Sequence, residues 1–391
     1  MVAFRFSSAL FVLAAILPAQ VRSLVPHVPD PLAHWRAARA SGTATIAVIG
    51  DSISEGDGTV YPNGYVDLLK KHFRDETGDA GYGYLMPHVI SASGYWALAT
   101  DYAPLGNGIK GTAGAKLMFS ANSVIDAVKV FYAGMPDSAP FSVSIDNQPP
   151  VLVTAIQPGV NEARFPVATG DHAVTITAPD AGCLYFIGAS VERGNTGVRV
   201  HNLSHYGRRA HDASYGTRMD ILNILKPDLT ILAIGVNDRG LDVSDYTQAM
   251  LSAIRKAQTF GSVLIVTENP NTDTAVLPDG IAARPPIIDV DQVLTDSTGS
   301  FRIDMFDAWG GTWKTANALG FMSADRVHPS SAGHQNYADT ILKVTESAPR
   351  ITRRFNMRLA RRRGTNGSRQ QGEFAQPPLQ KPPLAVVRRQ R

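Results

Sequence analysis

Two separated blocks of the sequence alternate short apolar runs with helical segments, and this rhythm constrains the fold more than any other feature. In the first block, the apolar run Thr45–Ile49 precedes the segment Tyr65–Phe73, whose apolar residues recur at helical spacing. The second block predicts strands at Leu229–Ile234, Ser262–Thr267 and Phe301–Phe306 and helices at Ser244–Phe260 and Ser331–Val344. Apolar strands that alternate with helices are typical of a parallel sheet covered by helices on both faces.

Between these blocks the pattern changes to short runs in which apolar and polar residues alternate. The runs are Ala127–Tyr132, Phe141–Ile145, Val151–Val153, Ala173–Thr177 and Cys183–Ile187. Period-2 runs separated by turn residues indicate an antiparallel sandwich or barrel. We therefore predict an α/β domain formed by residues 42–95 and 195–346, interrupted by an inserted β-sandwich module of residues 96–194.

The N-terminal residues 1–23 have the composition of a signal peptide. Arg5 precedes an apolar stretch at residues 8–17, and small residues follow as cleavage points. The stretch is about half of the ~20 apolar residues needed to span a bilayer, so cleavage is favoured and an uncleaved anchor is the alternative. A periplasmic or secreted location is expected.

The C-terminal residues 350–391 form a basic tail. Eleven Arg and one Lys stand there against a single Glu, whereas the whole chain carries a net charge of only +3. Two Pro-Pro pairs and the lack of apolar periodicity predict disorder. Such a tail could contact an acidic polymer, a membrane surface or a secretion-system partner, or it could be a solubilising extension. No nucleic-acid partner is expected outside the cytoplasm.

Gly50-Asp51-Ser52 ends the first apolar run and is the first candidate for catalysis. Ligands of an open α/β sheet bind beyond the carboxyl ends of its strands, and Ser52 would lie at that edge. By itself the tripeptide is equally compatible with a helix N-cap. A nucleophilic hydroxyl also needs a base and an acid that orients the base.

Partners for Ser52 follow other predicted strands or precede helices. Asp325 and His328 are three residues apart before the last helix, so the carboxylate could fix the imidazole tautomer while the other ring nitrogen faces Ser52. Asn237 follows the strand Leu229–Ile234 and could donate its amide to an oxyanion, and the backbone N–H of Gly207 could be a second donor. His201, His205 and His211 with Asp212 lack metal-ligand spacing. We therefore expect no metal or other cofactor.

With these residues in place, the sequence resembles the GDSL or SGNH hydrolases. The four blocks of that family appear in order as Gly50-Asp51-Ser52, Asn202…Gly207, Gly235-Val236-Asn237-Asp238 and Asp325-Arg326-Val327-His328. The resemblance implies a flavodoxin-like three-layer α/β/α sandwich. It also implies Ser52 as nucleophile, His328 as base, Asp325 as its orienter, and an oxyanion hole made by Ser52, Gly207 and Asn237. Ser204 stands where the family usually has Gly, so the block that contains Gly207 departs from the family pattern at this position.

The inserted module is similar to one found in a branch of this family, secreted bacterial esterases that deacetylate cell-wall or exopolysaccharide glycans. The aromatic segments Gly78–Tyr84 and Ser93–Trp96 lead into it, and exposed aromatic faces suit stacking on sugars. The expected function is thus an exported serine esterase that removes acyl groups, acetyl above all, from such a polysaccharide, cellulose-type export being one setting. The alternatives are a lipase or thioesterase, a glycan O-acyltransferase, and a non-catalytic glycan-binding protein.

Overall fold

The computed structural model describes residues 30–99, 101–121, 123–194, 196–271 and 285–347. The predicted signal peptide and basic tail lie outside the described residues. Within these ranges, every helix is too short or too polar to cross a membrane.

Five parallel strands form the central sheet, which confirms the predicted α/β fold. They are β13 (Gly197–Asn202), β1 (Thr43–Gly50), β14 (Leu229–Ala233), β15 (Ser262–Val266) and β16 (Phe301–Ile303), in this spatial order. Along the chain of the α/β domain this order is second, first, third, fourth, fifth, which is the flavodoxin-like arrangement.

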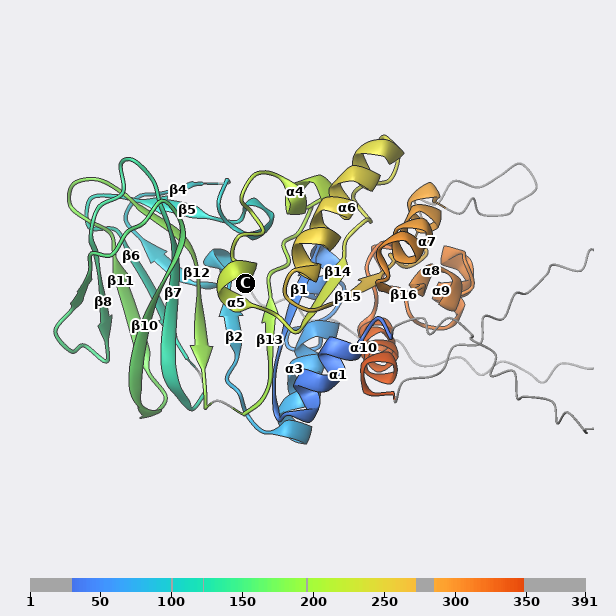
Figure 1. Ribbon diagram of the computed structural model, residues 1–391, viewed down its shortest axis with the longest axis horizontal. Coiled ribbons are helices and arrows are strands. Elements are labelled where there is room, and N and C mark those ends of the chain that lie inside the picture. The colour runs from blue at the N-terminus through green and yellow to red at the C-terminus, as the bar shows by residue number, and fades with distance from the viewer. Residues whose placement is uncertain (1–29, 100, 122, 195, 272–284, 348–391) are drawn as a thin grey trace, which may run out of the picture. The chain divides into compact units, whose positions relative to one another are not determined.

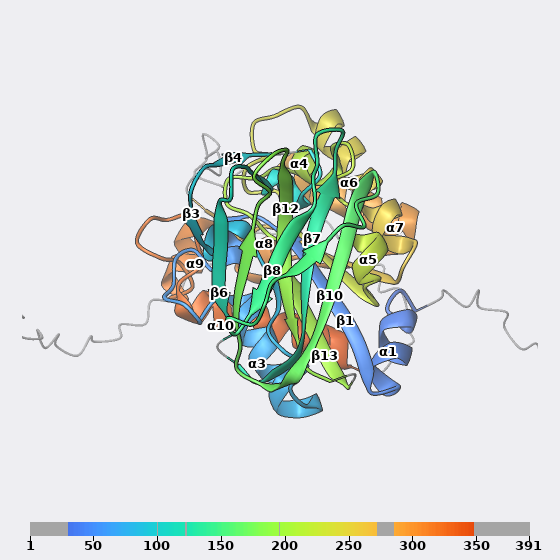
Figure 2. The same ribbon diagram turned by 90° about the vertical axis from the view of Figure 1, so that its left-hand side faces the viewer.

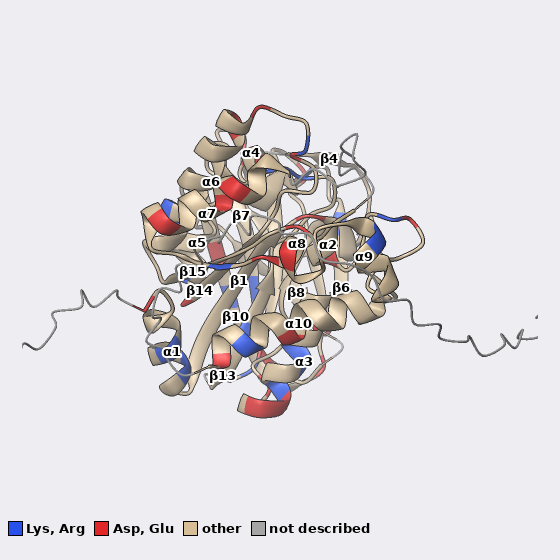
Figure 3. Ribbon diagram, turned by 90° about the vertical axis from the view of Figure 1, so that its right-hand side faces the viewer, with Lys and Arg blue, Asp and Glu red and all other residues tan. Residues whose placement is uncertain are grey.

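Helices cover both faces of this sheet, because successive residues of a buried strand point to opposite sides. In β1, Ile49 packs in the core with α4 (Ala210–Ser214), α5 (Leu222–Leu225), α6 (Val243–Gln258) and α7 (Pro286–Thr298). The neighbouring Val48 packs in a second core with α1 (Ala33–Ala40), α3 (Tyr65–Thr77), α8 (Met305–Ala308), α9 (Trp313–Ala318) and α10 (Ser331–Glu346). Figure 3 shows acidic and basic residues interspersed on this second face, where Arg39 of α1 pairs with Glu346 of α10 at 2.7 Å.

The predicted strand Phe301–Phe306 is too long. The strand ends at Ile303 because the carboxylate of Asp304 accepts a hydrogen bond from the N–H of Asp307 at 2.9 Å and caps the short helix α8. A capping side chain of this kind favours a helix start over a continued strand.

The inserted module consists of two antiparallel sheets around a shared core (Figures 1 and 2). One sheet contains β10 (Gly159–Gly170), β7 (Ile125–Gly134), β12 (Leu184–Glu192), β5 (Ile109–Gly111), β4 (Trp96–Leu98) and β2 (Gly83–Leu85). The other contains β3 (Ser91–Ser93), β6 (Lys116–Ser120), β11 (Ala173–Thr177), β8 (Phe141–Ile145) and β9 (Val151–Val153). Fully buried Phe131 of β7 belongs to the core that also contains Ile49 of β1, so the module and the central sheet share apolar packing.

The module begins earlier in the chain than predicted. Residues 42–95 were expected to belong to the α/β domain, but β2 pairs with β12 and β3 pairs with β6. Strand pairing therefore places the start of the module near Gly83 rather than at residue 96.

Candidate active site

Ser52 is the first residue of a single-turn helix, α2 (Ser52–Glu55), directly after β1. A Cβ at Gly50 would collide with the side chain of Ser54 and the carbonyl of Ala233, so only glycine lets the chain turn here. Asp51 caps the helix by accepting the N–H of Ile53 at 3.0 Å. The sequence left open whether Ser52 caps a helix, and the structure gives that role to Asp51.

The side chains of Ser52, His328 and Asp325 form a continuous chain of hydrogen bonds. Ser52 Oγ lies 2.8 Å from His328 Nε2, and His328 Nδ1 lies 2.7 Å from Asp325 Oδ2. The second carboxylate oxygen, Oδ1, accepts the N–H groups of Val327 and His328 at 2.9 Å and the hydroxyl of Ser323 at 2.6 Å. The loop therefore fixes the position of the Asp325 carboxylate independently of its contact with the His328 ring.

The carboxylate of Asp325 remains ionised in this setting. Its partial burial favours the protonated form, but the hydrogen bonds from Ser323, His328 and Val327 outweigh this effect and hold its pKa well below the usual range. An ionised Asp325 favours the proton on Nδ1 of His328. Nε2 is then left as an acceptor toward Ser52.

Asp51 differs from Asp325 although it is next to the candidate nucleophile. Complete burial raises its pKa to about 7, against hydrogen bonds from the backbone of Ile53, Gly235 and Val236 that lower it. Asp51 therefore joins β1 to the loop after β14, which is a structural role.

The two predicted oxyanion donors lie on adjacent loops that are tied together. Asn237 Nδ2 donates to the carbonyl of Arg208 at 2.9 Å, and because the amide has two N–H groups, one remains for a substrate. Gly207 has φ +68°, and no atom lies within 4 Å of the place a Cβ would occupy. The left-handed backbone, rather than close packing, is therefore what favours glycine at this position.

Asn202 and Ser204, which the sequence placed in the second block, have structural roles. The Asn202 amide donates to the carbonyl of Ser54 in α2 at 2.9 Å, and its oxygen accepts the N–H of Ser204 at 3.1 Å. These bonds fix the loop that carries Gly207 to the helix that carries Ser52.

Two acidic residues that the sequence reasoning missed lie close to this site. Asp57 Oδ2 is 3.9 Å from His328 Nε2. Glu55, at the end of α2, contacts His88 and His205. Both follow Ser52 within a few residues, so the run Ser54-Glu55-Gly56-Asp57 was the available signal.

The histidines that were considered together in the sequence separate in the structure. His201 is buried in β13, and His211 lies against Tyr215. Among the described residues, the group with metal-ligand spacing is Glu55, His88 and His205.

A groove of about 710 Å³ runs between α3 and the module. Tyr61, Tyr82 and Lys70 line it, with Lys70 Nζ 3.6 Å from the centre of the Tyr82 ring. Tyr61 is 69% exposed. Tyr84, which the sequence grouped with Tyr82, is instead buried, and its hydroxyl donates to the carbonyl of Ile187 at 2.6 Å.

Comparison with known proteins gives one family match and several structural ones. The GDSL-like lipase/acylhydrolase family model matches residues 168–335, a range that includes Gly207, Asn237, Asp325 and His328 but not Ser52. No curated protein sequence matches the chain.

A peptidoglycan O-acetylesterase is among the solved structures that match, with 20% identity and a TM-score of 0.62, over 82% of this chain and 97% of that chain. This likeness shows a shared fold. A Bacillus subtilis protein has 17% identity and a TM-score of 0.36, over 68% of this chain and 90% of its own. A family two carbohydrate esterase from Clostridium thermocellum, in complex with cellohexaose, has 12% identity and a TM-score of 0.27, over 65% and 98%. These two are too distant to carry an argument.

Proposed function

We propose that this chain, whose residues 168–335 match the GDSL-like lipase/acylhydrolase family model, is a serine esterase that removes acetyl groups from a polysaccharide. The observation that carries the proposal is the hydrogen-bonded chain from Ser52 through His328 to Asp325, at 2.8 and 2.7 Å. We propose further that the enzyme is exported and that the glycan belongs to a cell wall or an exopolysaccharide.

In the proposed reaction, Ser52 Oγ attacks the ester carbonyl while His328 Nε2 accepts the hydroxyl proton. Asp325 stabilises the imidazolium that forms. The N–H groups of Ser52 and Gly207 and the amide of Asn237 donate to the oxyanion of the tetrahedral intermediate.

When the intermediate collapses, the bond between the acetyl carbon and the sugar oxygen breaks, His328 donates its proton to that oxygen, and the sugar leaves as a free hydroxyl while an acetyl-Ser52 ester remains. Water then attacks this ester while His328 accepts its proton, the bond to Ser52 Oγ breaks, and His328 returns the proton to Oγ as acetate is released. The chain provides every acid, base and donor used in these steps.

Two features support a glycan as the substrate. The groove beside α3 presents Tyr61 and Tyr82, and aromatic faces of this kind can stack on sugar rings. The fold is shared with a peptidoglycan O-acetylesterase over most of both chains. The basic tail would add an attraction for an acidic polymer, a membrane surface or a secretion-system partner.

The test is acetate release from a panel of acetylated polysaccharides, together with p-nitrophenyl acetate as a small substrate. Ser52→Ala should lower kcat by at least about 10⁴-fold on both. Ser54→Ala, a matched change in the same helix whose hydroxyl contacts Tyr65 at 2.7 Å, should keep the activity.

Full activity of Ser52→Ala would refute the mechanism. Faster turnover of long-chain acyl esters or acyl-thioesters than of acetylated glycans would instead identify a lipase or thioesterase. Acetyl groups recovered on an added acceptor sugar would identify an O-acyltransferase, and glycan binding without any hydrolysis a binding protein.

A further inference from the structure

Glu55, His88 and His205 converge beside α2, and the proposed hydrolysis uses none of them. Glu55 Oε1 lies 3.2 Å from His88 Nε2 and 3.4 Å from His205 Nδ1. The two imidazole rings are stacked with their centres 5.3 Å apart. One potential ligand atom from each residue falls within 4.8 Å of the other two.

These separations are long for hydrogen-bonded ion pairs. Charge-assisted N–H···O bonds are usually about 2.7–2.9 Å long. Two other His–carboxylate pairs of this chain reach that length, at 2.7 Å for His328 and Asp325 and 2.6 Å for His172 and Asp146, whereas His34 and Asp228 are 3.1 Å apart. A single oxygen that lies 3.2 and 3.4 Å from two imidazole nitrogens leaves room for an ion held between the three side chains.

The distances from Glu55 Oε1 to the two histidine nitrogens match the distance between two ligand atoms of a tetrahedral metal site. Zinc binds imidazole nitrogen and carboxylate oxygen at about 2.0–2.2 Å, so two ligands at the tetrahedral angle lie about 3.3–3.5 Å apart. Two imidazoles and one carboxylate are also a ligand set that zinc uses, with a fourth position left for water or another ligand.

We propose that Glu55, His88 and His205 bind a divalent transition-metal ion of the zinc type. The side chains of Glu55 and His205 are 9% and 7% exposed, so most of the site is shielded from solvent. The side chain of His88 is 35% exposed and leaves a path for the ion.

Asn107 would orient one of the ligands. Its side-chain amide lies 3.1 Å from Nδ1 of His88. When Nε2 of His88 binds a metal, Nδ1 carries the proton and needs an acceptor. The Asn107 side chain provides it when its amide oxygen and nitrogen exchange places, which is an amide flip. Metal-bound histidines almost always have such a partner on the other nitrogen.

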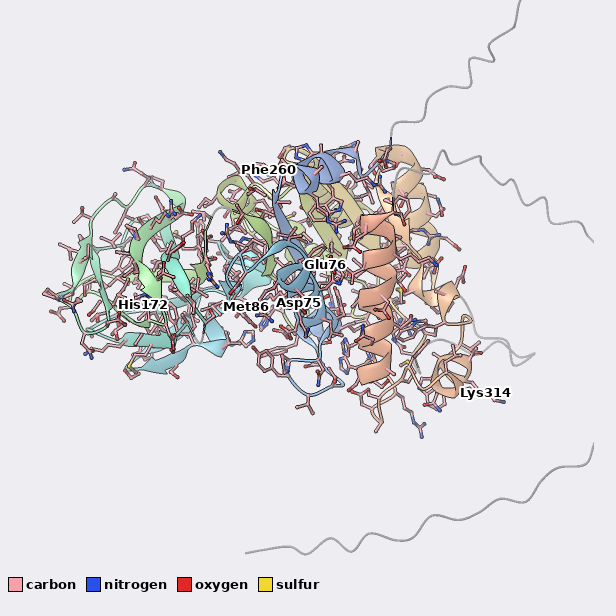
Figure 4. All side chains as sticks on the ribbon, turned by 90° about the horizontal axis from the view of Figure 1, so that it is seen from below. Asp75, Glu76, Met86, His172, Phe260 and Lys314 are labelled. Atoms are coloured by element: carbon pink, nitrogen blue, oxygen red, sulfur yellow. The ribbon has the colours of Figure 1, made fainter. Side chains whose placement is uncertain are left out.

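The ion would join three segments that are distant in the sequence. Glu55 ends the helix that begins with Ser52, and His205 precedes Gly207 in the loop after β13. His88 lies in the short helix η1 (Pro87–Val89), between strands β2 and β3 of the module. In Figure 4, Met86, two residues before His88, lies between the part of the module that carries His172 and helix α3 with Asp75 and Glu76. The bound metal would therefore hold the module against the loops of the candidate active site.

The experiment uses the full chain without a histidine tag, freed of metal by a chelator and then desalted. Zn²⁺ is titrated by calorimetry, and Co²⁺ binding is followed by its visible absorption. We expect one equivalent of Zn²⁺, a tetrahedral Co²⁺ spectrum that Zn²⁺ displaces, and a higher melting temperature with Zn²⁺.

Variants assign the ligands. His88→Ala and Glu55→Gln should each weaken Zn²⁺ binding by at least about 100-fold, and Asn107→Ala by about 10–100-fold. His211→Ala, a histidine outside the cluster, and Ser52→Ala should bind Zn²⁺ like the parent, which separates this proposal from the proposed hydrolysis.

The proposal would be overturned if the parent protein does not bind one equivalent of Zn²⁺. This outcome does not depend on whether the variants fold. Binding that persists unchanged in both His88→Ala and Glu55→Gln would also overturn it, because the ion would then lie elsewhere.

Discussion

An Asp325→Asn substitution is expected to reverse the tautomer of His328 without moving its ring. Oδ1 of Asp325 accepts two backbone N–H groups, from Val327 and His328, both at 2.9 Å. In asparagine, only the amide oxygen can accept these two N–H groups, so it must occupy the position of Oδ1. The amide NH₂ is then forced into the position of Oδ2, 2.7 Å from Nδ1 of His328. Nδ1 must become an acceptor, and the proton moves to Nε2.

The magnitude follows from this geometry. An Nε2 that carries a proton 2.8 Å from Ser52 Oγ cannot accept the hydroxyl proton. The equivalent tautomer reversal in a serine protease lowers kcat by about 10⁴-fold. That corresponds to about 5.4 kcal/mol of transition-state stabilisation. KM for a small ester should change little, because the substituted atom does not contact the substrate.

The assay is steady-state hydrolysis of p-nitrophenyl acetate, with circular dichroism and thermal melting to confirm the fold. Ser323→Ala is the matched control, because it removes the 2.6 Å hydroxyl contact to Oδ1 but leaves the carboxylate and both backbone contacts. It should stay within about tenfold of the parent, since one donor of three is lost. A folded Asp325→Asn enzyme that keeps more than a tenth of the parent kcat would refute the assignment of Asp325.

Three further predictions concern the oxyanion donor, the groove and a buried acid. Asn237→Ala should lower kcat by about 10²–10³-fold on p-nitrophenyl acetate with little change in KM, and an unchanged kcat would exclude its amide from the oxyanion hole. Tyr61→Ala should raise KM for an acetylated polysaccharide but not for p-nitrophenyl acetate, and equal effects on both would contradict a role in glycan binding. Burial raises the pKa of Asp291 to about 8, so the folded protein holds a proton that the unfolded chain releases above about pH 4. The contribution of Asp291 to stability is present below pH 4 and is lost as the pH rises to 8. In urea titrations across that window, the parent should lose up to about 1.4 kcal/mol of unfolding free energy per pH unit relative to Asp291→Asn. Curves that run parallel for the two proteins would contradict the raised pKa.

The central sheet could be predicted from the sequence because its strands are buried on both faces. Such strands are continuous apolar runs, as in Val263–Val266, and their pattern survives without any knowledge of neighbours. The module was harder. β10 is largely half-exposed and contains Pro166, and β2 and β3 have only three residues each, too few to show a period. Their membership in the module depends on pairing with β12 and β6, which only the folded chain reveals.

The site divides in the same way. Ser52, Asp325 and His328 were predictable as candidates because each lies in a short local motif next to a strand end or a helix start, and the structure brings them together. A helix cap within Gly50-Asp51-Ser52 was an open alternative, but the ties made by Asn202 were not predictable, since they depend on which backbone groups the fold leaves without partners. No sequence motif links Glu55 and His88, because they come together only when the module packs against the α/β domain.

The way the module is attached bears directly on catalysis. The chain enters the module through β2 and leaves it through β12, and these two strands are paired with each other. Tyr84 of β2 donates to the carbonyl of Ile187 in β12 and lies in the core that also contains Ile49 of β1, just before Gly50-Asp51-Ser52. Paired links and a common core leave the module little freedom to turn as a separate body. The groove is lined by residues of α3 and of the module and by none of Ser52, His328 and Asp325, so a glycan held there would keep a fixed orientation relative to the sheet that carries Ser52.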